Sequence, residues 1–311
     1  MNDEFAHRSV LLEQAVDALL VDRSGCYIDA TYGRGGHSRL ILNRLSANGR
    51  LFALDHDPAA VQAAEKLASE DPRVTITRES FVNLAGFADR YQLTGQVSGV
   101  LLDLGVSSPQ LDDASRGFSF LHDGPLDMRM NPDAGPSAAQ WVNSASEKEI
   151  ATVLHHYGEE RFARRMARAI AAARAEQPIE RTGRLAEIIK QANPSWERDK
   201  HPATRAFQGI RIFINRELDA LRQALDDAVQ VLRTGGRLVV ISFHSLEDKI
   251  VKNFMSLQTK GDNFPRDLPV MHSELHPTLK TIGKALRPDA EEISRNPRSR
   301  SAIMRVAEKI A

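Results

Sequence analysis

The chain has 311 residues, of which 42% are hydrophobic and 26% are charged, and its 41 basic residues balance 41 acidic ones. This composition is typical of a globular protein with a sizeable core, and no apolar run reaches the roughly 18 residues of a membrane-spanning helix. The single cysteine, Cys26, excludes an internal disulfide and a cysteine-based zinc site. We therefore expect a cytoplasmic protein with no membrane segment.

The charges are unevenly distributed. Residues 158–216 contain thirteen Lys and Arg against seven Asp and Glu, and residues 280–309 contain eight against four. The rest of the chain therefore carries ten more acidic than basic side chains. Local basic surface on a neutral protein is compatible with a nucleic-acid partner, although solvated helix faces give the same counts.

The first hundred residues alternate between helical and extended patterns. An apolar helix face is predicted around residues 12–20. Four strands are then expected within residues 26–33, 50–57, 74–80 and 97–106, with helices at 37–46 and 58–68 between them. Such alternation favours a parallel sheet with crossover helices.

The alternation stops after the fourth strand. Residues 110–209 contain no good strand pattern, only loops and helical runs at 146–158, 160–177 and 184–193. An apolar stripe from Ile214 to Leu232 predicts one long helix, which Thr234–Gly236 is expected to end. A fifth strand follows at 237–243, and segments near 280–286 and 302–307 could complete the sheet. We predict a discontinuous α/β domain, residues 1–109 and 210–311, with a helical insert at 110–209.

Glycines crowd the turn after the first predicted strand, in "IDATYGRGGHS" (residues 28–38). Such a turn lies at the carboxyl edge of the sheet, where open α/β folds bind ligands. An ATP-type loop is excluded because no Lys-Ser or Lys-Thr follows the glycines. A dinucleotide fingerprint fits Gly33 and Gly35 but has Ser38 at its third glycine. The S-adenosylmethionine pattern, acidic-x-G-x-G-x-G, fits Asp29, Gly33 and Gly35, with Thr31 in place of its first glycine.

A second acidic residue supports an adenosine-containing ligand. Asp55 ends the second predicted strand about twenty residues past the loop, where a carboxylate can accept both ribose hydroxyls. This position does not separate a dinucleotide from S-adenosylmethionine, and a structural turn with a solvated aspartate would look the same.

The end of the fourth strand does separate them. It reads "LDLGVSSPQ" (residues 102–110), and amine-directed nucleic-acid methyltransferases carry [DNS]-P-P-[YFW] at this place. Ser108 and Pro109 match loosely, with Gln110 where the second proline would stand. A dehydrogenase needs no such motif, although a turn capped by serine and proline is an alternative.

Seven blocks together resemble one family. They are "DATYGRGGHS", "LLDLGVSSPQLDDASRGFSF", "DGPLDMRM", "YGEERFARRMARAI", "HPATRAFQGIRIFINREL", "GGRLVVISFHSLEDKIVK" and "NPRSRSAIMRVAEK". The chain resembles the bacterial 16S ribosomal RNA cytosine-N4 methyltransferase family, RsmH or MraW, over nearly its whole length. The resemblance implies a class I, Rossmann-like methyltransferase sheet with a helical insert after strand four. It also implies S-adenosylmethionine as the methyl donor and, as the acceptor, the N4 amine of a cytidine in the decoding region of small-subunit ribosomal RNA.

The loop pattern and the resemblance give the expected cofactor residues: Gly33, Gly35, Gly36, His37, Asp55, Phe81, Asp103 and Gln110. Phe81 could pack against the adenine, and Asp103 could attract the methionyl ammonium or the sulfonium region. The cytosine amine is a poor nucleophile, so positioning should supply most of the rate. The Ser108 hydroxyl and the Pro109 carbonyl are our candidates for positioning it, with Asp103 a weaker alternative. His244 and Ser245, after strand five, fit helix capping as well as catalysis.

The insert offers arginines for RNA. Arg161, Arg164, Arg165 and Arg168 should share one side of a helix, as should Arg205, Gln208, Arg211 and Asn215. Salt bridges or a solvated face would explain both stripes equally well. The expected partner is small-subunit ribosomal RNA or the assembled 30S subunit. No metal site is expected, because His272 and His276 around Glu274 lack a third ligand.

Two other functions remain open on the residues alone. A nicotinamide oxidoreductase is disfavoured by Ser38 and by the Ser-Ser-Pro-Gln turn. A catalytically silent nucleotide-binding module on the ribosome would differ only in transferring no methyl group.

Overall fold

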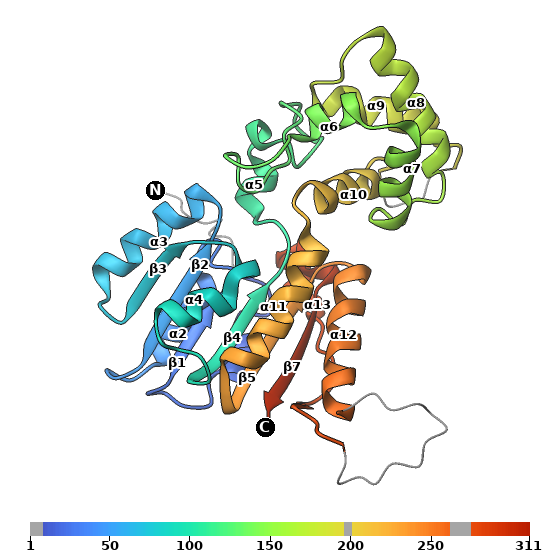
Figure 1. Cartoon of the computed structure of the whole chain (residues 1–311). Coiled ribbons are helices and arrows are strands. Elements are labelled where there is room, and N and C mark those ends of the chain that lie inside the picture. The colour runs from blue at the N-terminus through green and yellow to red at the C-terminus, as the bar shows by residue number, and fades with distance from the viewer. Residues whose placement is uncertain (1–8, 196–200, 262–274) are drawn as a thin grey trace. The chain divides into compact units, whose positions relative to one another are not determined.

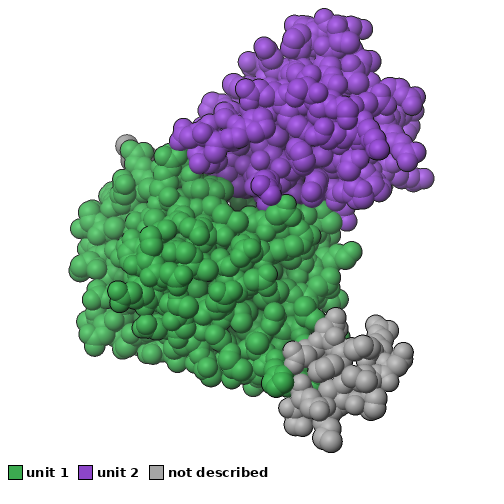
Figure 2. All heavy atoms as spheres, in the orientation of Figure 1, with its two compact units in different colours: residues 1–105, 218–311 green, residues 106–217 purple. Residues whose placement is uncertain are grey.

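The structure, a computed structural model, describes residues 9–195, 201–261 and 275–311. The chain forms two compact units, residues 1–105 with 218–311 and residues 106–217, which Figure 2 colours separately. The domain limits expected from the sequence, at 109/110 and 209/210, both fall inside the second unit. None of the helices in the described ranges is long and apolar enough to cross a membrane.

The first unit is built on a mixed seven-stranded sheet in the order β3-β2-β1-β4-β5-β7-β6 (Figure 1). The strands are β1 (Cys26–Asp29), β2 (Arg50–Asp55), β3 (Val74–Arg78), β4 (Val97–Asp103), β5 (Leu232–Ser242), β6 (Leu279–Thr281) and β7 (Ile303–Lys309). Strands β1 to β5 run parallel, and β7 is antiparallel to β5 and β6. The prediction of parallel strands is confirmed for β1 to β5, and the two late segments complete the sheet through the antiparallel strand β7.

Chain order reverses between β1 and β4, because β2 and β3 extend the sheet on one side and β5 extends it on the other. In open α/β sheets such a switch point marks the ligand crevice beyond the carboxyl ends of the strands. Asp29, Asp55 and Asp103 are the last residues of β1, β2 and β4. Three carboxylates thus stand along one edge of the sheet.

Helices cover both faces of this sheet. They are α1 (Leu12–Leu19), α2 (Gly36–Arg44), α3 (Pro58–Glu70), α4 (Leu84–Arg90), α11 (Glu217–Val231) and α12 (Ser245–Lys260). Side chains alternate across a strand, so Val100 and Leu102 of β4 pack with α4, α11 and α12, whereas Leu101 packs with α1, α2 and α3. A strand buried on both faces explains the uninterrupted apolar run of β4.

The expected helix end at Thr234–Gly236 is wrong. Helix α11 ends at Val231, and β5 begins at the next residue. Val97 pairs with Leu232, but the next paired residue on β4, Gly99, faces Arg237, so β5 carries extra residues in between. The glycines belong to this irregularity: Gly235 has a φ of +79°, and a Cβ on Gly236 would lie 2.8 Å from the Val97 carbonyl oxygen.

The second unit is helical, as expected for the insert. Its helices are α5 (Ser108–Asp112), α6 (Ala138–Ser144), α7 (Glu147–His156), α8 (Ala163–Glu176), α9 (Thr182–Ala192) and α10 (Thr204–Ile214). Its core holds buried Trp141, Met166, Ile170 and Ile210. Within the described part of residues 106–217 there is one isolated bridge, Pro125 with Arg181, and no strand.

Candidate active site

The glycine turn joins β1 to α2. Gly35 is the N-cap of α2 and has a φ of +72°, a left-handed conformation that side chains disfavour. A Cβ there would lie 2.3 Å from the Tyr32 hydroxyl oxygen. The position therefore requires glycine for conformation and for space, and the turn presents main-chain atoms at the carboxyl edge of the sheet.

Asp55 fastens this turn to β2. The Gly33 amide donates to Asp55 Oδ2 at 2.8 Å, and the Asp57 amide donates to Oδ1 at 2.9 Å. Burial raises the pKa of Asp55, although both amide hydrogen bonds oppose that rise. Each carboxylate oxygen keeps a further lone pair for a ligand hydroxyl.

Asp29 and Thr31 connect the turn to the rest of the edge. Ser38 Oγ donates to Asp29 Oδ2 at 2.6 Å, and the Thr31 amide donates to Oδ1 at 3.2 Å. Burial raises the pKa of Asp29 to about 6. The Thr31 hydroxyl accepts the Asp103 amide proton at 2.6 Å, which ties β1 to β4. In the sequence, Thr31 and Ser38 stand where the glycine patterns have glycine. A hydroxyl residue in place of glycine was the only sign that these positions form hydrogen bonds.

Asp103 and His37 lie together but do not form an ion pair. Asp103 Oδ2 is 3.6 Å from His37 Nδ1. Burial lowers the pKa of His37 to about 4, so the imidazole is neutral at pH 7. Burial, followed by the charges of Asp29 and Glu247, raises the pKa of Asp103 well above its usual range. Asp103 Oδ1 and His37 Nε2 are buried and have no hydrogen-bond partner among the described residues.

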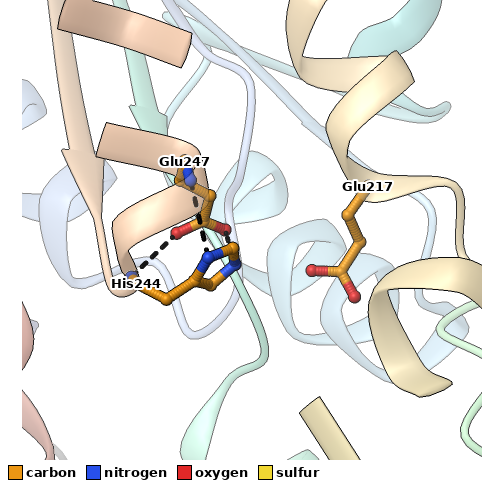
Figure 3. Close-up of side chains that lie close together, drawn as sticks. All are labelled: Glu217, His244 and Glu247. Carbon is orange, nitrogen blue, oxygen red and sulfur yellow. Dashed lines mark hydrogen bonds and ion pairs between the residues drawn. The ribbon is translucent and has the colours of Figure 1, made fainter. Parts of the chain in front are cut away.

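The end of β5 is closed by a helix cap (Figure 3). The His244 side chain caps α12, and Glu247 Oε2 accepts the Phe243 amide proton at 2.8 Å. His244 Nε2 also lies 3.1 Å from Glu247 Oε1, and both side chains are buried. The capping role left open by the sequence is therefore present. Glu217, also drawn in Figure 3, is the last residue of the second unit and binds Arg211 there.

The remaining cofactor candidates have structural contacts of their own. Phe81 opens the 3-10 helix η1 (Phe81–Asn83) and is half-buried against the core that contains α4. In the second unit, Gln110 Oε1 accepts the Ser107 amide proton at 2.8 Å. The Pro109 carbonyl accepts the Asp113 amide proton at 2.9 Å. Ser108 is the first residue of α5.

The two arginine stripes differ. Arg164, Arg165 and Arg168 are exposed on α8. Arg168 forms a long ion pair, with 3.9 Å between its Nε and Glu147 Oε1. Arg161 precedes the helix, with its guanidinium 5.5 Å from the centre of the Phe162 ring.

The α10 stripe is partly turned inward. Arg205 is half-buried. Arg211 binds both carboxylate oxygens of Glu217 at 2.9 Å, and the Asn215 amide bridges the Met128 carbonyl and the Met130 amide. Of the histidine pair weighed as metal ligands, His272 lies outside the described residues, as does Glu274 between the two.

These features define a class of enzyme. Three features together are typical of a class I methyltransferase. They are the strand order with antiparallel β7 between β5 and β6, the glycine turn after β1, and the acidic residues that end β1, β2 and β4. The sequence profile of the MraW methylase family matches residues 4–310. The chain belongs to the MraW methylase family.

A curated relative agrees with this assignment. The ribosomal RNA small subunit methyltransferase H of Chromohalobacter salexigens is 58% identical over 308 residues, covering 99% of this chain and 92% of that protein.

Solved structures are more distant. An rRNA methylase from Streptococcus thermophilus is 11% identical with a TM-score of 0.43, covering 96% of this chain and 93% of that one. The N-methyltransferase NodS from Bradyrhizobium japonicum is 8% identical with a TM-score of 0.40, covering 97% and 93%. At these TM-scores the likeness supports no inference about this chain.

Proposed function

We propose that this chain transfers the methyl group of S-adenosylmethionine to the exocyclic N4 amine of a cytidine in the decoding region of small-subunit ribosomal RNA. Membership of the MraW methylase family and 58% identity to a small-subunit ribosomal RNA methyltransferase carry the reaction and the substrate class. The edge formed by the glycine turn, Asp55 and Asp103 supplies the chemistry that a sulfonium nucleoside needs.

The residues present fit S-adenosylmethionine, which when bound supplies an electrophilic methyl carbon on a positively charged sulfur. The Gly35 turn leaves no room for a side chain and lets a ligand approach the main chain. Asp55 holds that turn while keeping lone pairs for the ribose hydroxyls. Asp103 Oδ1, buried and without a described partner, suits the methionyl ammonium.

Charge favours a cationic ligand over a phosphate. Asp29, Asp55 and Asp103 end three strands at this edge, and His37 is neutral at pH 7 because burial lowers its pKa to about 4. Burial raises the pKa of all three carboxyl groups, and a cationic ligand beside them favours their ionised forms, whereas an anionic dinucleotide opposes ionisation. The electrostatics therefore favour S-adenosylmethionine over NAD.

The amine is activated by positioning. Its lone pair is delocalised into the cytosine ring, so acceptors must hold its hydrogens while the nitrogen is aligned with the sulfur–methyl axis. Ser108 and Pro109 follow Asp103 closely along the chain, at the place of the amine-binding motif. Because the Pro109 carbonyl already accepts a helical hydrogen bond, the Ser108 hydroxyl is the stronger candidate. The amine proton becomes acidic once the nitrogen is alkylated, so no strong base is required.

The target base must be unpaired or swung out to be methylated. We assign Arg161, Arg164, Arg165 and Arg168 to RNA phosphates, because the three on α8 are exposed and weakly engaged within the chain. Arg205, which is half-buried, is retained as a weaker candidate, whereas Arg211 is set aside because it binds both carboxylate oxygens of Glu217. The partner is small-subunit ribosomal RNA, free or in the 30S subunit, which implies a cytoplasmic enzyme.

The test is transfer of a labelled methyl group to small ribosomal subunits and to free 16S ribosomal RNA from cells lacking the protein. We expect label in N4-methylcytidine, and we expect Asp103→Asn to reduce transfer while keeping the folded state. Titration calorimetry should show binding of S-adenosylmethionine and not of NAD. Donor binding without transfer to either substrate would favour the silent module.

A further inference from the structure

A basic segment lies outside the residues assigned so far. Between β6 and β7, residues 284–301 carry five Lys and Arg against three Asp and Glu. The segment contains helix α13 (Ala290–Arg295) and the 3-10 helix η4 (Pro297–Ser301). It belongs to the methyltransferase unit and is separate in sequence from the arginines of α8.

Strand register places this segment at the active edge of the sheet. Ile303, the first residue of β7, pairs with Ser242, the last residue of β5. Leu286 pairs with Met304, so the chain between them projects beyond the carboxyl ends of the parallel strands, where Figure 1 shows α13.

Two contacts bring the segment close to the glycine turn. Glu292 of α13 accepts the Leu11 amide proton at 2.7 Å. Two residues earlier, Ser9 is packed on the turn, because a Cβ on Gly36 would lie 2.2 Å from Ser9 Oγ. The basic segment therefore contacts residues Ser9–Leu11, and these residues in turn contact the glycine turn at the same edge of the sheet.

The acids of this segment are occupied, and several cations are not. Asp289 caps α13, Glu291 pairs with Arg295, and Glu292 holds Leu11. By contrast, the exposed cations Lys284, Arg287 and Arg300 make no ion pair in the described parts of the chain. The three acids of the segment are therefore engaged by other groups and do not neutralise these three cations.

The cations are presented by an ordered turn. Ser299 is fully buried, and its hydroxyl donates to the Asn296 carbonyl at 2.7 Å. Asn296 in turn accepts the Arg298 amide proton. Arg300 therefore projects from a fixed turn, which reduces the entropy lost when it binds an anion.

We propose that residues 284–301 form a second RNA-contact surface, which binds backbone phosphates of the RNA flanking the target nucleotide through Lys284, Arg287 and Arg300. Guanidinium and ammonium groups are the usual phosphate ligands. The segment has no Phe, Tyr, Trp or His on which a base could stack. The contact is therefore to backbone phosphates and is independent of sequence. The inference rests on the proposed function, because it assumes that RNA is the substrate.

The test compares two triple variants of the full-length protein. K284Q/R287Q/R300Q removes the proposed phosphate ligands. The control, R23Q/R50Q/K66Q, removes three exposed cations elsewhere on the same unit, including Arg50 at the start of β2, on the opposite edge. Affinity for 16S ribosomal RNA is measured by filter binding between roughly 50 and 200 mM salt, and calorimetry with S-adenosylhomocysteine checks the cofactor site.

We expect the first variant to lose about tenfold or more in RNA affinity at the lower salt concentration, with a log–log salt slope smaller by about 2, since each phosphate contact contributes ~0.7 on single strands. The control should match the wild type. Single variants R287Q and R300Q should each lower the slope by somewhat less than 1, which keeps the test valid if the triple variant does not bind S-adenosylhomocysteine.

An unchanged slope in these variants, or an equal loss in the control, would overturn the proposal. Loss of binding to anionic lipid vesicles with no change in RNA binding would overturn it as well. Failure of the proposed function looks different: the wild-type protein itself would transfer no methyl group to ribosomal RNA.

Discussion

Asp29 offers a direct test of the electrostatics at the active edge. The side chain is fully buried at the end of β1, and its pKa is about 6 in the folded chain against an ordinary value of 3.8. Below both values the carboxyl is protonated in the folded and unfolded states and has no effect on stability. Between them the unfolded chain releases a proton that the folded chain keeps, so the free energy of unfolding falls as pH rises.

The size of this effect follows from the two pKa values. Their difference corresponds to about 3 kcal/mol of lost stability by pH 7. Asp29→Asn keeps an acceptor for the Thr31 amide and a neighbour for the Ser38 hydroxyl while removing the charge. We therefore expect the variant to be more stable than the wild type at pH 7 by up to ~3 kcal/mol and to lose this advantage near pH 4.

The assay is urea unfolding of the wild type and Asp29→Asn at a series of pH values. The comparison has to be a difference between the two proteins, because His37 acts in the opposite direction: burial lowers its pKa to about 4, so its protonation destabilises the fold as pH falls. A difference in unfolding free energy that stays constant from pH 4 to pH 7 would refute a buried, ionising Asp29. A wild-type protein whose unfolding free energy rises relative to that of Asp29→Asn as pH rises would refute it too.

Three further predictions concern the turn, the cofactor and the second unit. Gly35→Ala should cost more than Gly95→Ala: both glycines have a φ of +72°, but only the first has a neighbour within 4 Å. Thermal unfolding should show a loss of about 1–2 kcal/mol in unfolding free energy for Gly95→Ala. The loss should be larger for Gly35→Ala, which should also bind the cofactor more weakly. Equal losses in the two variants would contradict the packing described around Gly35. Asp103→Asn should weaken S-adenosylmethionine binding roughly tenfold to a hundredfold, as for loss of a charge-assisted hydrogen bond, and unchanged calorimetric affinity would remove Asp103 from the site. Arg211→Gln should destabilise the second unit by about 3 kcal/mol, since it leaves Glu217 buried without its Arg211 partner. The same variant should leave the salt slope of RNA binding unchanged. A smaller salt slope with normal stability would show that Arg211 contacts RNA.

The sheet could be predicted because its signals are local. Apolar runs of strand length end in acidic residues at Asp29, Asp55 and Asp103, and amphipathic helical patterns separate them. Each strand followed by a crossover helix returns to the same edge, so the sequence alone brings the three carboxylates together. The glycine turn and its ligand class follow from the same reasoning, with the family resemblance selecting S-adenosylmethionine.

What the sequence missed depends on register and on partners distant along the chain. Thr234–Gly236 looks like a helix end, but the pairing of β5 with Val97 and Gly99 makes it a strand irregularity. Spacing places Arg211 and Asn215 on one helix face, yet it does not reveal that this face meets Glu217 and the Met128–Met130 loop. The position of the 284–301 segment likewise follows only from the antiparallel register of β7.

The most direct test of the assigned activity is mass spectrometry of small-subunit ribosomal RNA nucleosides from cells lacking this protein, complemented with the wild type or with Asp103→Asn. We expect N4-methylcytidine to disappear in the deletion strain, to return with the wild type and to return far less with the variant. An N4-methyl mark that persists in full without the protein would contradict the proposed reaction.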